Sequence, residues 1–560
     1  MPPEAPAREG VELLELRVLD GANRFFTRPA VKLEFGADAP GAAAEAAIAA
    51  GEAVRRLYAG LDLAPPRMRM RHSADARRAI VAFPWRRRTI AQAIGAAAAR
   101  LALGIGRESR ELRALRAMAL GPLPALPKAR IPIVAITGTN GKSTTTRLLA
   151  HIAATAGRKV GMTNSDGIYV RGELVEAGDW TGFGGAGRVL AEGGLDLAVL
   201  ETARGGILLR GIGYAENDVS VVTNVSADHL GLQGIDTLDE LAEVKGAIVR
   251  ITKRDGWAVL NAQDDRVWAM RRQTRANRYA FSLDPDAPAV RQALEGGGRA
   301  AVLLDGWLVL RRAGSRALKL APADELPVTF GGLSRYNVAN ALAAVAAADA
   351  LGIRPAHIRE GLRTFAQDTA SNPGRMNLFG RDGRLVLVDF AHNEAGLAGL
   401  LDVCRRLAGA DGPEGSAPGQ PGRGRGSVRV AIGTAGDRSD EILHNLGRLA
   451  GDAADEIVIC EKRHYLRGRE LEELNRLLRE GVAAGGYRGK VPAYPTELAA
   501  LQAILERTRP GDVAAVMAHA ERQAIFDWLE ESGWRPTGVE ELRGILAGNA
   551  RPRAPARRGR

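Results

Sequence analysis

Residues 131–150, with the sequence IPIVAITGTNGKSTTTRLLA, constrain most strongly what this chain of 560 residues can fold into. The segment begins with an apolar run that is typical of a buried strand. A short glycine-rich turn follows, and then a run with helical character. Strand, glycine-rich turn and helix in this order predict a phosphate-binding loop, because Gly138 and Gly141 let backbone N–H groups face an anion at a helix N-terminus.

Two side chains of this loop carry the predicted chemistry. Lys142 is expected to reach the terminal phosphates of a nucleotide, and the Ser143 hydroxyl is expected to ligate Mg²⁺. The strict form of the motif requires a glycine at position 136, where this chain has Ile136. The loop therefore has the shorter form TGTNGKST, at residues 137–144.

Composition excludes several classes of protein. Hydrophobic residues make up 46% of the chain, which is ample for packed cores, and the length allows three or four domains. No run of eighteen apolar residues predicts a membrane-spanning helix, and the N-terminus lacks the order of a signal peptide. The two cysteines, Cys404 and Cys460, lie far apart and argue for a reducing compartment, against a disulfide framework or zinc cluster. We expect a cytoplasmic protein that has no membrane partner.

The net charge of +12 comes partly from one short segment of the chain. Five of the positive charges lie in the C-terminal tail, at Arg551, Arg553, Arg557, Arg558 and Arg560. We expect this basic tail, residues 547–560, to be disordered and solubilising, and we expect no specific nucleic-acid partner. A low-complexity stretch at residues 409–427 is expected to form a mobile loop.

The pattern along the chain predicts an α/β protein of three domains. Residues 1–128 are expected to form a small α+β N-terminal domain, with two strands within 11–35, a strand at 79–83, and alanine-rich helices at 41–60 and 88–120. A proline-rich linker ends it. Residues 129–366 repeat strand, loop and helix, which predicts a central ATP-binding domain of the P-loop type around a parallel sheet. Residues 367–546 predict a smaller, Rossmann-like C-terminal domain.

Polar residues follow several of the predicted central strands. Glu201 ends the strand at 195–200, Asp228 and His229 follow the strand at 219–225, and Asn261 follows the strand at 257–260. Because ligands gather at the carboxyl ends of parallel strands, these positions predict one site.

Each candidate also has a structural interpretation. Glu201 could reach a Mg²⁺ held by Ser143, or it could cap the next helix. His229, beside Asn224 and Asp228, could ligate a second Mg²⁺ or orient a phosphate, whereas a lone histidine is more often structural. Lys245 lies on a predicted helix and, from its position alone, is expected to be a solvated surface lysine.

Six motifs, in this order and spacing, resemble those of the Mur ligase superfamily. They are TGTNGKST at 137–144, LETARGG at 200–206, NVSADHL at 224–230, RYNVANALAA at 335–344, PGRM at 373–376 and DFAHN at 389–393. The resemblance covers roughly residues 131–530. It is greatest to the Mur-ligase-like half of cyanophycin synthetases, through TNSDGIY at 163–169, residues 182–187, ETARGGIL at 201–208, GDRSDE at 436–441 and RGRE at 467–470.

The first 125 residues weakly resemble the N-terminal domain of those synthetases. The ATP-grasp module that they carry is absent, because nothing long enough lies between this region and Ile131. We therefore expect that this chain alone does not run the two-enzyme cycle that makes an aspartate–arginine polymer.

The resemblance implies an ATP-dependent ligase that activates a carboxylate as an acyl phosphate and joins it to an amino acid or other amine, giving ADP and phosphate. ATP and two Mg²⁺ ions are the implied cofactors. The implied catalytic residues are Lys142, His229, Lys245 and Arg375. The implied metal ligands are Ser143, Glu201, His229 and Lys245, the last as a carbamate.

The implied nucleotide contacts extend beyond the loop. They are Gly138, Thr139, Asn140, Gly141, Lys142, Ser143, Thr144, Asn337 at the adenine, Arg375 at the γ-phosphate and Asp389 at the ribose. The substrate residues implied are Thr163, Asp166, Thr181, Thr202, Arg204, His392, Asn393, Asp437 and Arg438, with His392, Asn393 and the loop 434–441 facing the incoming amine. The general base is not identified.

Two other classes remain open at this point. One is a non-catalytic ATP-binding partner of a separate ligase, and the other is a P-loop kinase or NTPase. The intact set of Lys142, Glu201, His229 and Lys245 argues against the first, and DFAHN in a second α/β domain argues against the second. The expected partners are a small-molecule or peptide carboxylate and an amine, with a second copy of the chain or an ATP-grasp ligase as further candidates.

Overall fold

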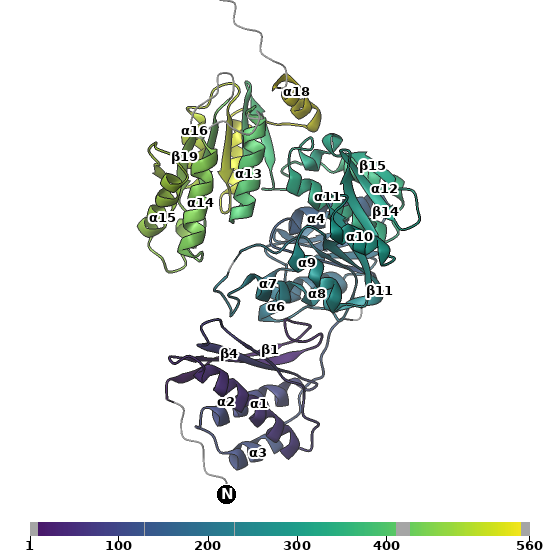
Figure 1. Cartoon of the computed structure of the whole chain (residues 1–560), viewed down its shortest axis with the longest axis vertical. Coiled ribbons are helices and arrows are strands. Elements are labelled where there is room, and N and C mark those ends of the chain that lie inside the picture. Colours follow the sequence, from purple (N-terminus) through teal and green to yellow (C-terminus); the bar gives the residue numbers. More distant parts are fainter. Residues whose placement is uncertain (1–8, 128, 229, 410–425, 550–560) are drawn as a thin grey trace, which may run out of the picture. The chain divides into compact units, whose positions relative to one another are not determined.

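The computed structural model describes residues 9–127, 129–228, 230–409 and 426–549 (Figure 1). The chain divides into two compact units. The first contains Met1–Gly138, Gly157–Val225 and Gly231–Tyr279, and the second contains Thr139–Ala156, Ser226–Leu230 and Ala280–Arg560.

The first unit begins with a four-stranded antiparallel sheet. Its order is β1 (Val11–Leu19), β2 (Ala30–Ala37), β4 (Arg78–Pro84) and β3 (Arg69–His72). The helices are α1 (Ala42–Gly60), α2 (Arg88–Ala102) and α3 (Glu108–Arg116). The alanine-rich faces of α1 and α2 pack on the sheet, where Leu33, Phe35 and Phe83 are buried, because small side chains allow a close approach (Figure 1).

This N-terminal region, residues 9–116, has the predicted α+β fold. Two details differ from the prediction. The segment 88–120 contains two helices, because the chain breaks at Gly104, whose φ of 72° is left-handed. The strand β3 was not predicted, because RMRH is almost wholly polar and lies at the sheet edge with exposed side chains.

The large sheet of the first unit has the strand order β11, β10, β5, β9, β6, β7, β8. The bounds are β5 (Ile133–Thr137), β6 (Val160–Thr163), β7 (Gly167–Val170), β8 (Glu173–Ala177), β9 (Leu197–Glu201), β10 (Asn217–Val222) and β11 (Thr252–Asn261). The helices are α5 (Phe183–Leu190), α6 (Arg204–Leu209), α7 (Leu238–Lys245), α8 (Ala247–Arg250) and α9 (Asp265–Ala269), with a 3₁₀ turn at Met270–Gln273. The wholly buried strand β5 pairs in parallel with β9 and β10, so their carboxyl ends meet at one edge.

The second unit begins with α4 (Lys142–Thr155), which packs against α11 (Arg335–Ala350) and α12 (Pro355–Thr364). Before α11 the chain runs through β12 (Asn277–Ser282), α10 (Pro288–Glu295) and the antiparallel strands β13 (Arg299–Leu304), β14 (Trp307–Arg312) and β15 (Leu318–Pro322). Two 3₁₀ turns, Ala323–Glu325 and Pro327–Thr329, lead into α11. Helix α11 is buried on nearly every side, which explains its composition of small residues.

A second sheet of this unit has the order β20, β19, β18, β21, β17, β16, β22. The strand bounds are β16 (Asn377–Arg381), β17 (Arg384–Asp389), β18 (Val428–Ile432), β19 (Glu456–Cys460), β20 (Ala493–Tyr494), β21 (Val513–Met517) and β22 (Arg535–Pro536). The helices are α13 (Glu394–Leu407), α14 (Asp440–Ala453), α15 (Leu471–Ala484), α16 (Glu497–Leu505), α17 (Arg522–Glu531) and α18 (Val539–Asn549), with a 3₁₀ turn at Arg463–Tyr465. Apolar runs at 384–389, 428–432, 457–460 and 513–517 predict four strands, and these form its parallel core as β17, β18, β19 and β21. The short edge strands were not predicted.

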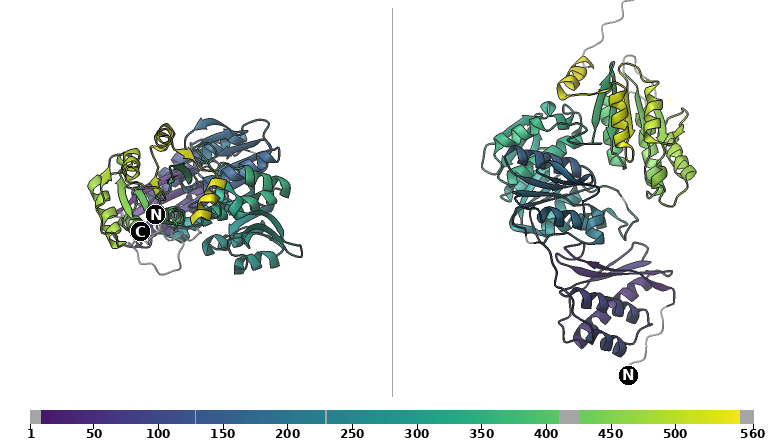
Figure 2. Two further views of the ribbon diagram at one scale, coloured as in Figure 1. Left: turned by 90° about the horizontal axis from the view of Figure 1, so that it is seen from above. Right: turned by 180° about the vertical axis from the view of Figure 1, so that it is seen from behind.

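Helices cover both faces of this sheet (Figure 2). Alternate residues of one strand show why: Val386 and Val388 of β17 pack with α16 and α17, whereas Leu387 packs with α13, α14 and α15. A parallel sheet that is covered on both faces is the predicted Rossmann-like architecture.

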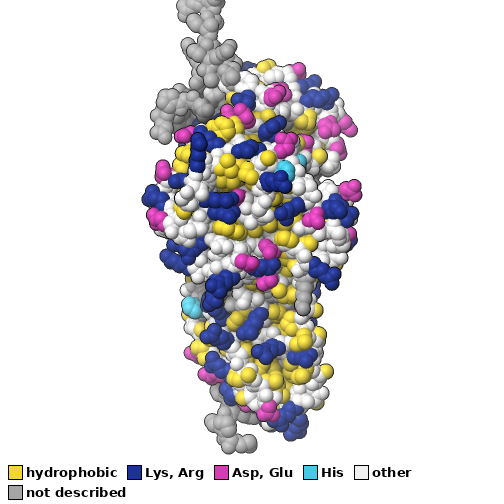
Figure 3. Space-filling view, turned by 90° about the vertical axis from the view of Figure 1, so that its right-hand side faces the viewer, with side chains coloured by type: hydrophobic (Ala, Val, Ile, Leu, Met, Phe, Trp, Pro, Cys, Tyr) yellow, Lys and Arg dark blue, Asp and Glu magenta, His cyan; other side chains and the backbone are white. Residues whose placement is uncertain are grey.

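Several remaining predictions concern composition. Most of the predicted low-complexity loop and of the basic tail lies outside the described residues. Cys404 and Cys460 are both buried free thiols. The described residues contain no helix that combines the length and the apolar character needed to cross a membrane. On the face in Figure 3, Lys and Arg side chains are dispersed among other types of side chain.

Candidate functional site

The loop between β5 and α4 contains two positions that only glycine can occupy. Gly138 has φ of 154°, and a Cβ there would lie 1.8 Å from Thr223 Oγ1. Gly141, at the N-cap of α4, has φ of 84°, and a Cβ there would lie 2.0 Å from Asn340 Oδ1. Neighbouring side chains occupy the space that a Cβ would need at both positions, so only glycine fits there. The backbone N–H groups of the loop are therefore not covered by side chains of their own residues, and a phosphate could approach them closely.

Hydrogen bonds hold the side chains of this loop in place. Lys142 Nζ donates to the Thr139 carbonyl oxygen at 2.8 Å, so the lysine lies back across its own loop. Thr139 Oγ1 donates to the Ser226 carbonyl oxygen at 3.1 Å and accepts from Ser226 N at 3.0 Å. Ser143 and Thr144 open α4 and are buried. The loop residues Lys142, Ser143 and Thr144 therefore lie at a helix N-terminus, where the dipole favours anions.

Glu201 lies at the carboxyl end of β9, beside the end of β5. Thr137 Oγ1 donates to the Thr202 carbonyl oxygen at 2.6 Å, and Thr202 N donates to the Ile136 carbonyl oxygen at 2.7 Å. Glu201 is 3% exposed. It does not cap the next helix, because α6 has Ala203 at its N-cap. The helix-cap interpretation of Glu201 is therefore wrong.

Lys245 is buried, and its interpretation as a solvated surface lysine is wrong. The residue ends α7, is 3% exposed, and donates from Nζ to the Gly138 carbonyl oxygen at 2.7 Å. Sequence position alone gives the wrong answer because α7 also buries Leu241 and Val244 and carries Lys245 inward with them. Helix α7 is thus linked by a hydrogen bond to Gly138, the first glycine of the loop.

Asp228 lies between two of the residues that were predicted to face the amine. Its Oδ2 is 3.6 Å from His392 Nε2, and its Oδ1 is 3.4 Å from an Nη2 of Arg438, which is 6% exposed. Arg438 also lies 3.4 Å from the adjacent Asp437. His229, the predicted second metal ligand, lies outside the described residues. A carboxylate, an imidazole and a guanidinium therefore meet within the second unit.

Asn140 of the loop forms a reciprocal amide pair with Asn393. Asn140 Nδ2 donates to Asn393 Oδ1 at 3.2 Å, and Asn393 Nδ2 donates to Asn140 Oδ1 at 3.0 Å. Asn393 also caps α13 by accepting from Gly396 N at 2.9 Å. The pair therefore joins the loop to the DFAHN segment, and it brings a predicted nucleotide contact next to a residue that was predicted to face the amine.

The three predicted contacts to the rest of the nucleotide lie elsewhere in the second unit. Asp389 ends β17 and accepts from Met376 N at 2.8 Å, and burial raises the pKa of its carboxyl despite the opposing charge of Arg375. The Arg375 guanidinium lies over the Phe390 ring, 4.5 Å from its centroid. Asn337, 2% exposed, accepts from Asn340 Nδ2 at 3.1 Å. Arg375 and Asp389 thus lie close enough to interact electrostatically. Asn337 is hydrogen-bonded to Asn340, the residue that occupies the space beside Gly141.

The remaining substrate candidates gather at the ends of β6 and β9 in the first unit. Thr163 ends β6 and pairs with Leu200 of β9. The Thr181 carbonyl oxygen accepts from Ala203 N at 3.1 Å, next to Thr202. Two further candidates extend this group, since Asp166 N donates to Asn164 Oδ1 at 2.8 Å and Arg204 donates to the Leu232 carbonyl oxygen.

Sequence reasoning missed a buried cluster at the end of β21. Glu497 and Lys462 form an ion pair in which both side chains are 2% exposed. The same carboxylate accepts from the backbone N–H groups of His519 at 2.8 Å and Glu521 at 2.9 Å. His519 Nε2 donates to the Ala391 carbonyl oxygen at 2.7 Å, next to His392. The sequence offered a signal for His519 and Glu521, because AHAE directly follows the apolar run 513–517, but none for the pairing of Lys462 with Glu497.

Two buried amides were also missed. Asn340 fills the space at Gly141, and Asn372 Nδ2 donates to Thr144 Oγ1 at 3.4 Å. Asn340 lies in the quoted RYNVANALAA motif, whereas no local pattern marks Asn372. Within residues 9–127, 129–228, 230–409 and 426–549, no group of three or more His, Cys, Asp or Glu residues is placed to hold a metal. The proposed metal ligands therefore stay a prediction.

Comparisons with known proteins agree with this geometry. Residues 136–348 match the Mur ligase middle domain, and residues 374–520 match the Mur ligase glutamate ligase domain. A cyanophycin synthetase from Trichormus variabilis is 39% identical over 417 residues, which are 74% of this chain and 43% of that protein. The chain thus spans less than half the length of this relative.

Two further proteins share more of their length with the chain. A UDP-N-acetylmuramoyl-L-alanyl-D-glutamate--2,6-diaminopimelate ligase from Alkalilimnicola ehrlichii is 29% identical over 424 residues, 73% of this chain and 76% of that protein. The crystal structure of a bifunctional folylpolyglutamate synthase/dihydrofolate synthase gives a TM-score of 0.50 at 17% identity and covers 72% of this chain and 90% of that one, a likeness of fold. Since the two domain matches cover the loop, the strand ends and the C-terminal sheet described above, the chain belongs to the Mur ligase family.

Proposed function

We propose that this chain is an ATP-dependent carboxylate–amine ligase. It would activate a carboxylate as an acyl phosphate and join it to an amino acid or another amine, with release of ADP and phosphate. The observation that carries the proposal is the loop at residues 138–144, where two glycine-only positions precede Lys142 and Ser143 at a buried helix N-terminus. The relatives described above are a synthetase and a ligase by name.

The residues present fit a nucleotide with its divalent metal. Lys142 would leave the Thr139 carbonyl oxygen and bind the terminal phosphates, and the loop amides would bind the phosphate oxygens. Ser143, Glu201, His229 and a carbamylated Lys245 would hold Mg²⁺, which when bound stabilises negative charge on the phosphates. Glu201 and Lys245 suit this role because both are polar, buried and placed at the carboxyl edge of the parallel strands or against the loop.

The second unit would receive the amine. His392 Nδ1 lies 3.1 Å from the Phe390 carbonyl oxygen, so it donates its proton there and a neutral ring keeps a lone pair on Nε2. His392 Nε2 and Asp228 Oδ2 are 3.6 Å apart, and both would accept hydrogen bonds from one ammonium group. Arg438, on the other oxygen of Asp228, would bind the carboxylate of an incoming amino acid. We propose that His392 takes the proton that the amine must lose before it attacks.

The test is a screen for ADP and phosphate release across pairs of carboxylates and amines. We expect ADP to form at a substantial rate only when both substrates are present. Hydroxylamine offered with the carboxylate alone should give a hydroxamate, because it intercepts an acyl phosphate. ADP formation that is independent of any carboxylate would identify an NTPase, and phosphate transfer to an alcohol would identify a kinase. An absence of nucleotide binding would overturn the proposal.

A further inference from the structure

Arg24 of the N-terminal region is inserted against helix α7. Its side chain is 2% exposed, with Nη2 2.8 Å from Glu240 Oε1 and Nε 2.9 Å from Glu243 Oε2. Its Nη1 donates to the Gly234 carbonyl oxygen at 3.2 Å. The guanidinium therefore binds the helix and the loop that precedes it. The arginine is buried and the two carboxylates are partly buried, so removal of either side would leave a poorly solvated charge without its partner.

Arg24 lies in a turn, residues 21–28, that the side chain of Asn23 stabilises. Asn23 is wholly buried, and its Nδ2 donates to the carbonyl oxygens of Gly21 at 3.0 Å and Arg28 at 3.1 Å. Its Oδ1 accepts from Phe25 N at 2.9 Å and Phe26 N at 3.1 Å. One amide side chain thus satisfies four backbone groups, so the direction of Arg24 is fixed before it meets α7.

The same turn is attached to the chain that follows α6. Asp20 N donates to the Arg210 carbonyl oxygen and Ile212 N donates to the Ala22 carbonyl oxygen, both at 2.8 Å. A Cβ at Gly21 would lie 1.8 Å from the Ile212 carbonyl oxygen, so the two backbones are in direct contact.

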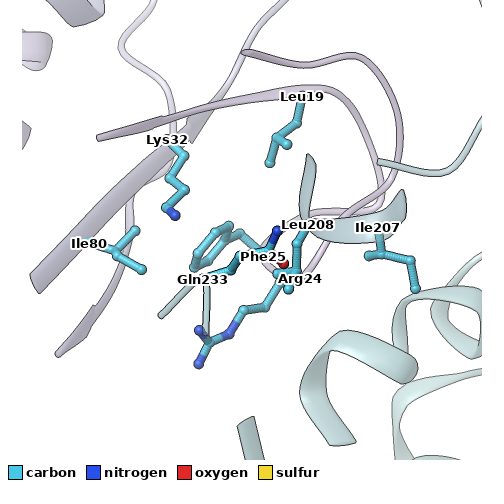
Figure 4. Close-up of a pocket in the computed structure, with 8 residues that line it drawn as sticks. All are labelled: Leu19, Arg24, Phe25, Lys32, Ile80, Ile207, Leu208 and Gln233. Atoms are coloured by element: carbon cyan, nitrogen blue, oxygen red, sulfur yellow. The ribbon is translucent and has the colours of Figure 1, made fainter. Parts of the chain in front are cut away.

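The space directly around the Arg24 side chain leaves no room for a ligand. Figure 4 shows Arg24 and Phe25 between side chains of the N-terminal sheet, such as Ile80, and the α6 residues Ile207 and Leu208. The cavity lined by these side chains has a volume of about 10 Å³, which is the size of one water molecule. The side chains around Arg24 and Phe25 are therefore closely packed.

Further arginines complete the attachment of α7. Arg71 of β3 also binds the Glu243 carboxylate, and an Nη2 of Arg78 lies 2.9 Å and 3.0 Å from the two oxygens of Asp236. Arg250 of α8 donates to the carbonyl oxygens of Asn23 at 2.9 Å and Arg24 at 3.0 Å. The charges on the two sides are complementary, with arginines of the N-terminal region against acids of α7 and its preceding loop.

The opposite side of α7 meets the phosphate-binding loop. Glu240 and Glu243 are three residues apart and therefore share one face of the helix. Lys245 follows Glu243 by two residues, which turns its side chain by roughly 200° about the helix axis. Its Nζ lies 2.7 Å from the Gly138 carbonyl oxygen. Any rotation or sliding of α7 that breaks the arginine contacts would also displace Lys245.

We propose that Arg24 is a positioning residue: through Glu240 and Glu243 it fixes α7 and so holds Lys245 against the phosphate-binding loop. The N-terminal region would then support the reaction through its contacts with α7. The part of the proposal that concerns activity rests on the proposed function, because it requires Lys245 to serve the metal or the phosphates. The part that concerns α7 does not.

The experiment compares Arg24→Ala with the wild-type protein in two measurements. Hydrogen exchange of backbone amides in residues 238–245 should become at least tenfold faster, while exchange in α4 stays unchanged. The Mg²⁺ concentration for half-maximal ADP formation should rise about tenfold or more, the usual effect of losing a residue that orients metal ligands. Arg24→Lys should give a smaller change in both, because it keeps the charge without the forked geometry.

Arg56→Ala is the matched control. Arg56 belongs to the same region and pairs with Glu108 at 2.9 Å, but both side chains are exposed. Its loss should change neither measurement. If Arg24→Ala does not fold, Glu243→Gln and Arg24→Lys replace it, and their effects on the Mg²⁺ requirement should be less than additive when combined.

Unchanged exchange in α7 together with an unchanged Mg²⁺ requirement in a folded Arg24→Ala protein would overturn the inference. A general loss of stability with no shift in the Mg²⁺ requirement would also overturn it, since that result means a structural role alone. If the wild-type protein forms no ADP with any substrate pair, the proposed function fails, and the exchange of α7 still decides whether Arg24 positions the helix.

Discussion

Lys245 Nζ lies 2.7 Å from the carbonyl oxygen of Gly138, although 107 residues separate the two along the chain. The lysine is 3% exposed, and a charged group is costly to bury without partners. The contact places an amine directly beside the first glycine of the phosphate-binding loop. This position suits a carbamylated metal ligand and also suits a cation that acts on phosphates, and the two roles make different predictions.

Replacing Lys245 by alanine should reduce ligation by about 10²-fold or more, the scale of a lost electrostatic contact in the transition state. The Gly138 carbonyl oxygen also loses a donor, so the free energy of unfolding should fall by about 1–3 kcal/mol, which leaves the protein folded. If Lys245 is carbamylated, added acetate should restore part of the ADP formation, because a carboxylate can occupy the vacated ligand position.

Lys253→Ala is the control for this variant, since Lys253 lies in the same unit but forms a more exposed ion pair with Asp218 at 2.7 Å. It should keep wild-type activity. Rescue of Lys245→Ala by a small amine rather than acetate would show that the residue acts as a cation, and undiminished ligation would refute both roles.

Lys142→Ala should abolish ATP turnover and leave the thermal unfolding curve unchanged. Lys142 is the lysine of the loop, and its Nζ donates to the carbonyl oxygen of the nearby Thr139 at 2.8 Å, so its removal disturbs little packing. Phosphate release measures the effect, and Lys159→Ala, at an exposed lysine beyond α4, serves as the comparison. Near-normal phosphate release by Lys142→Ala would place the nucleotide elsewhere.

Glu201→Ala should move the Mg²⁺ dependence of ADP formation to higher concentration and lower the maximal rate by about 10²-fold or more. The reason is the loss of a buried carboxylate at the end of β9. A Mg²⁺ titration with Glu192→Ala as the control tests this, because Glu192 pairs with Arg188 at the surface. A titration that matches the wild type would mean that Glu201 is structural.

His519 should make the stability of the C-terminal sheet depend on pH. Removal from water lowers the pKa of its imidazole well below 6.5, with the charges of Lys462, His392 and Arg438 acting in the same direction and the bond to Ala391 opposing. The neutral ring is therefore retained on folding, whereas the unfolded chain binds a proton below pH 6.5. Stability is complete above that pH and falls on acidification by about 1.4 kcal/mol per pH unit.

Urea unfolding of the wild type and of His519→Gln at pH 7.5 and pH 5.5 measures this effect. The difference between the two proteins should shrink or reverse at the lower pH, because the glutamine does not titrate. An equal loss of stability in both proteins would assign the pH dependence to other groups.

The sequence by itself determined the local elements of the site. The apolar run before Gly138 identified β5, the run before Glu201 identified β9, and the runs at 428–432 and 513–517 identified the core of the C-terminal sheet. These predictions succeeded because a wholly buried strand must be apolar along its whole length, which is visible in a few consecutive residues. Short polar edge strands such as β3 carry no such signal.

Only the tertiary structure decided which distant residues meet. The pairing of Asn140 with Asn393 spans 253 residues, and the contact of Arg24 with Glu243 spans 219. Nothing in the segment around Arg24 distinguished it from the other arginines of a basic chain, and nothing local showed that Lys245 is buried. Burial and ion pairing depend on which faces of separate helices and sheets pack together, and that packing is fixed by apolar surfaces far from the charged residues themselves.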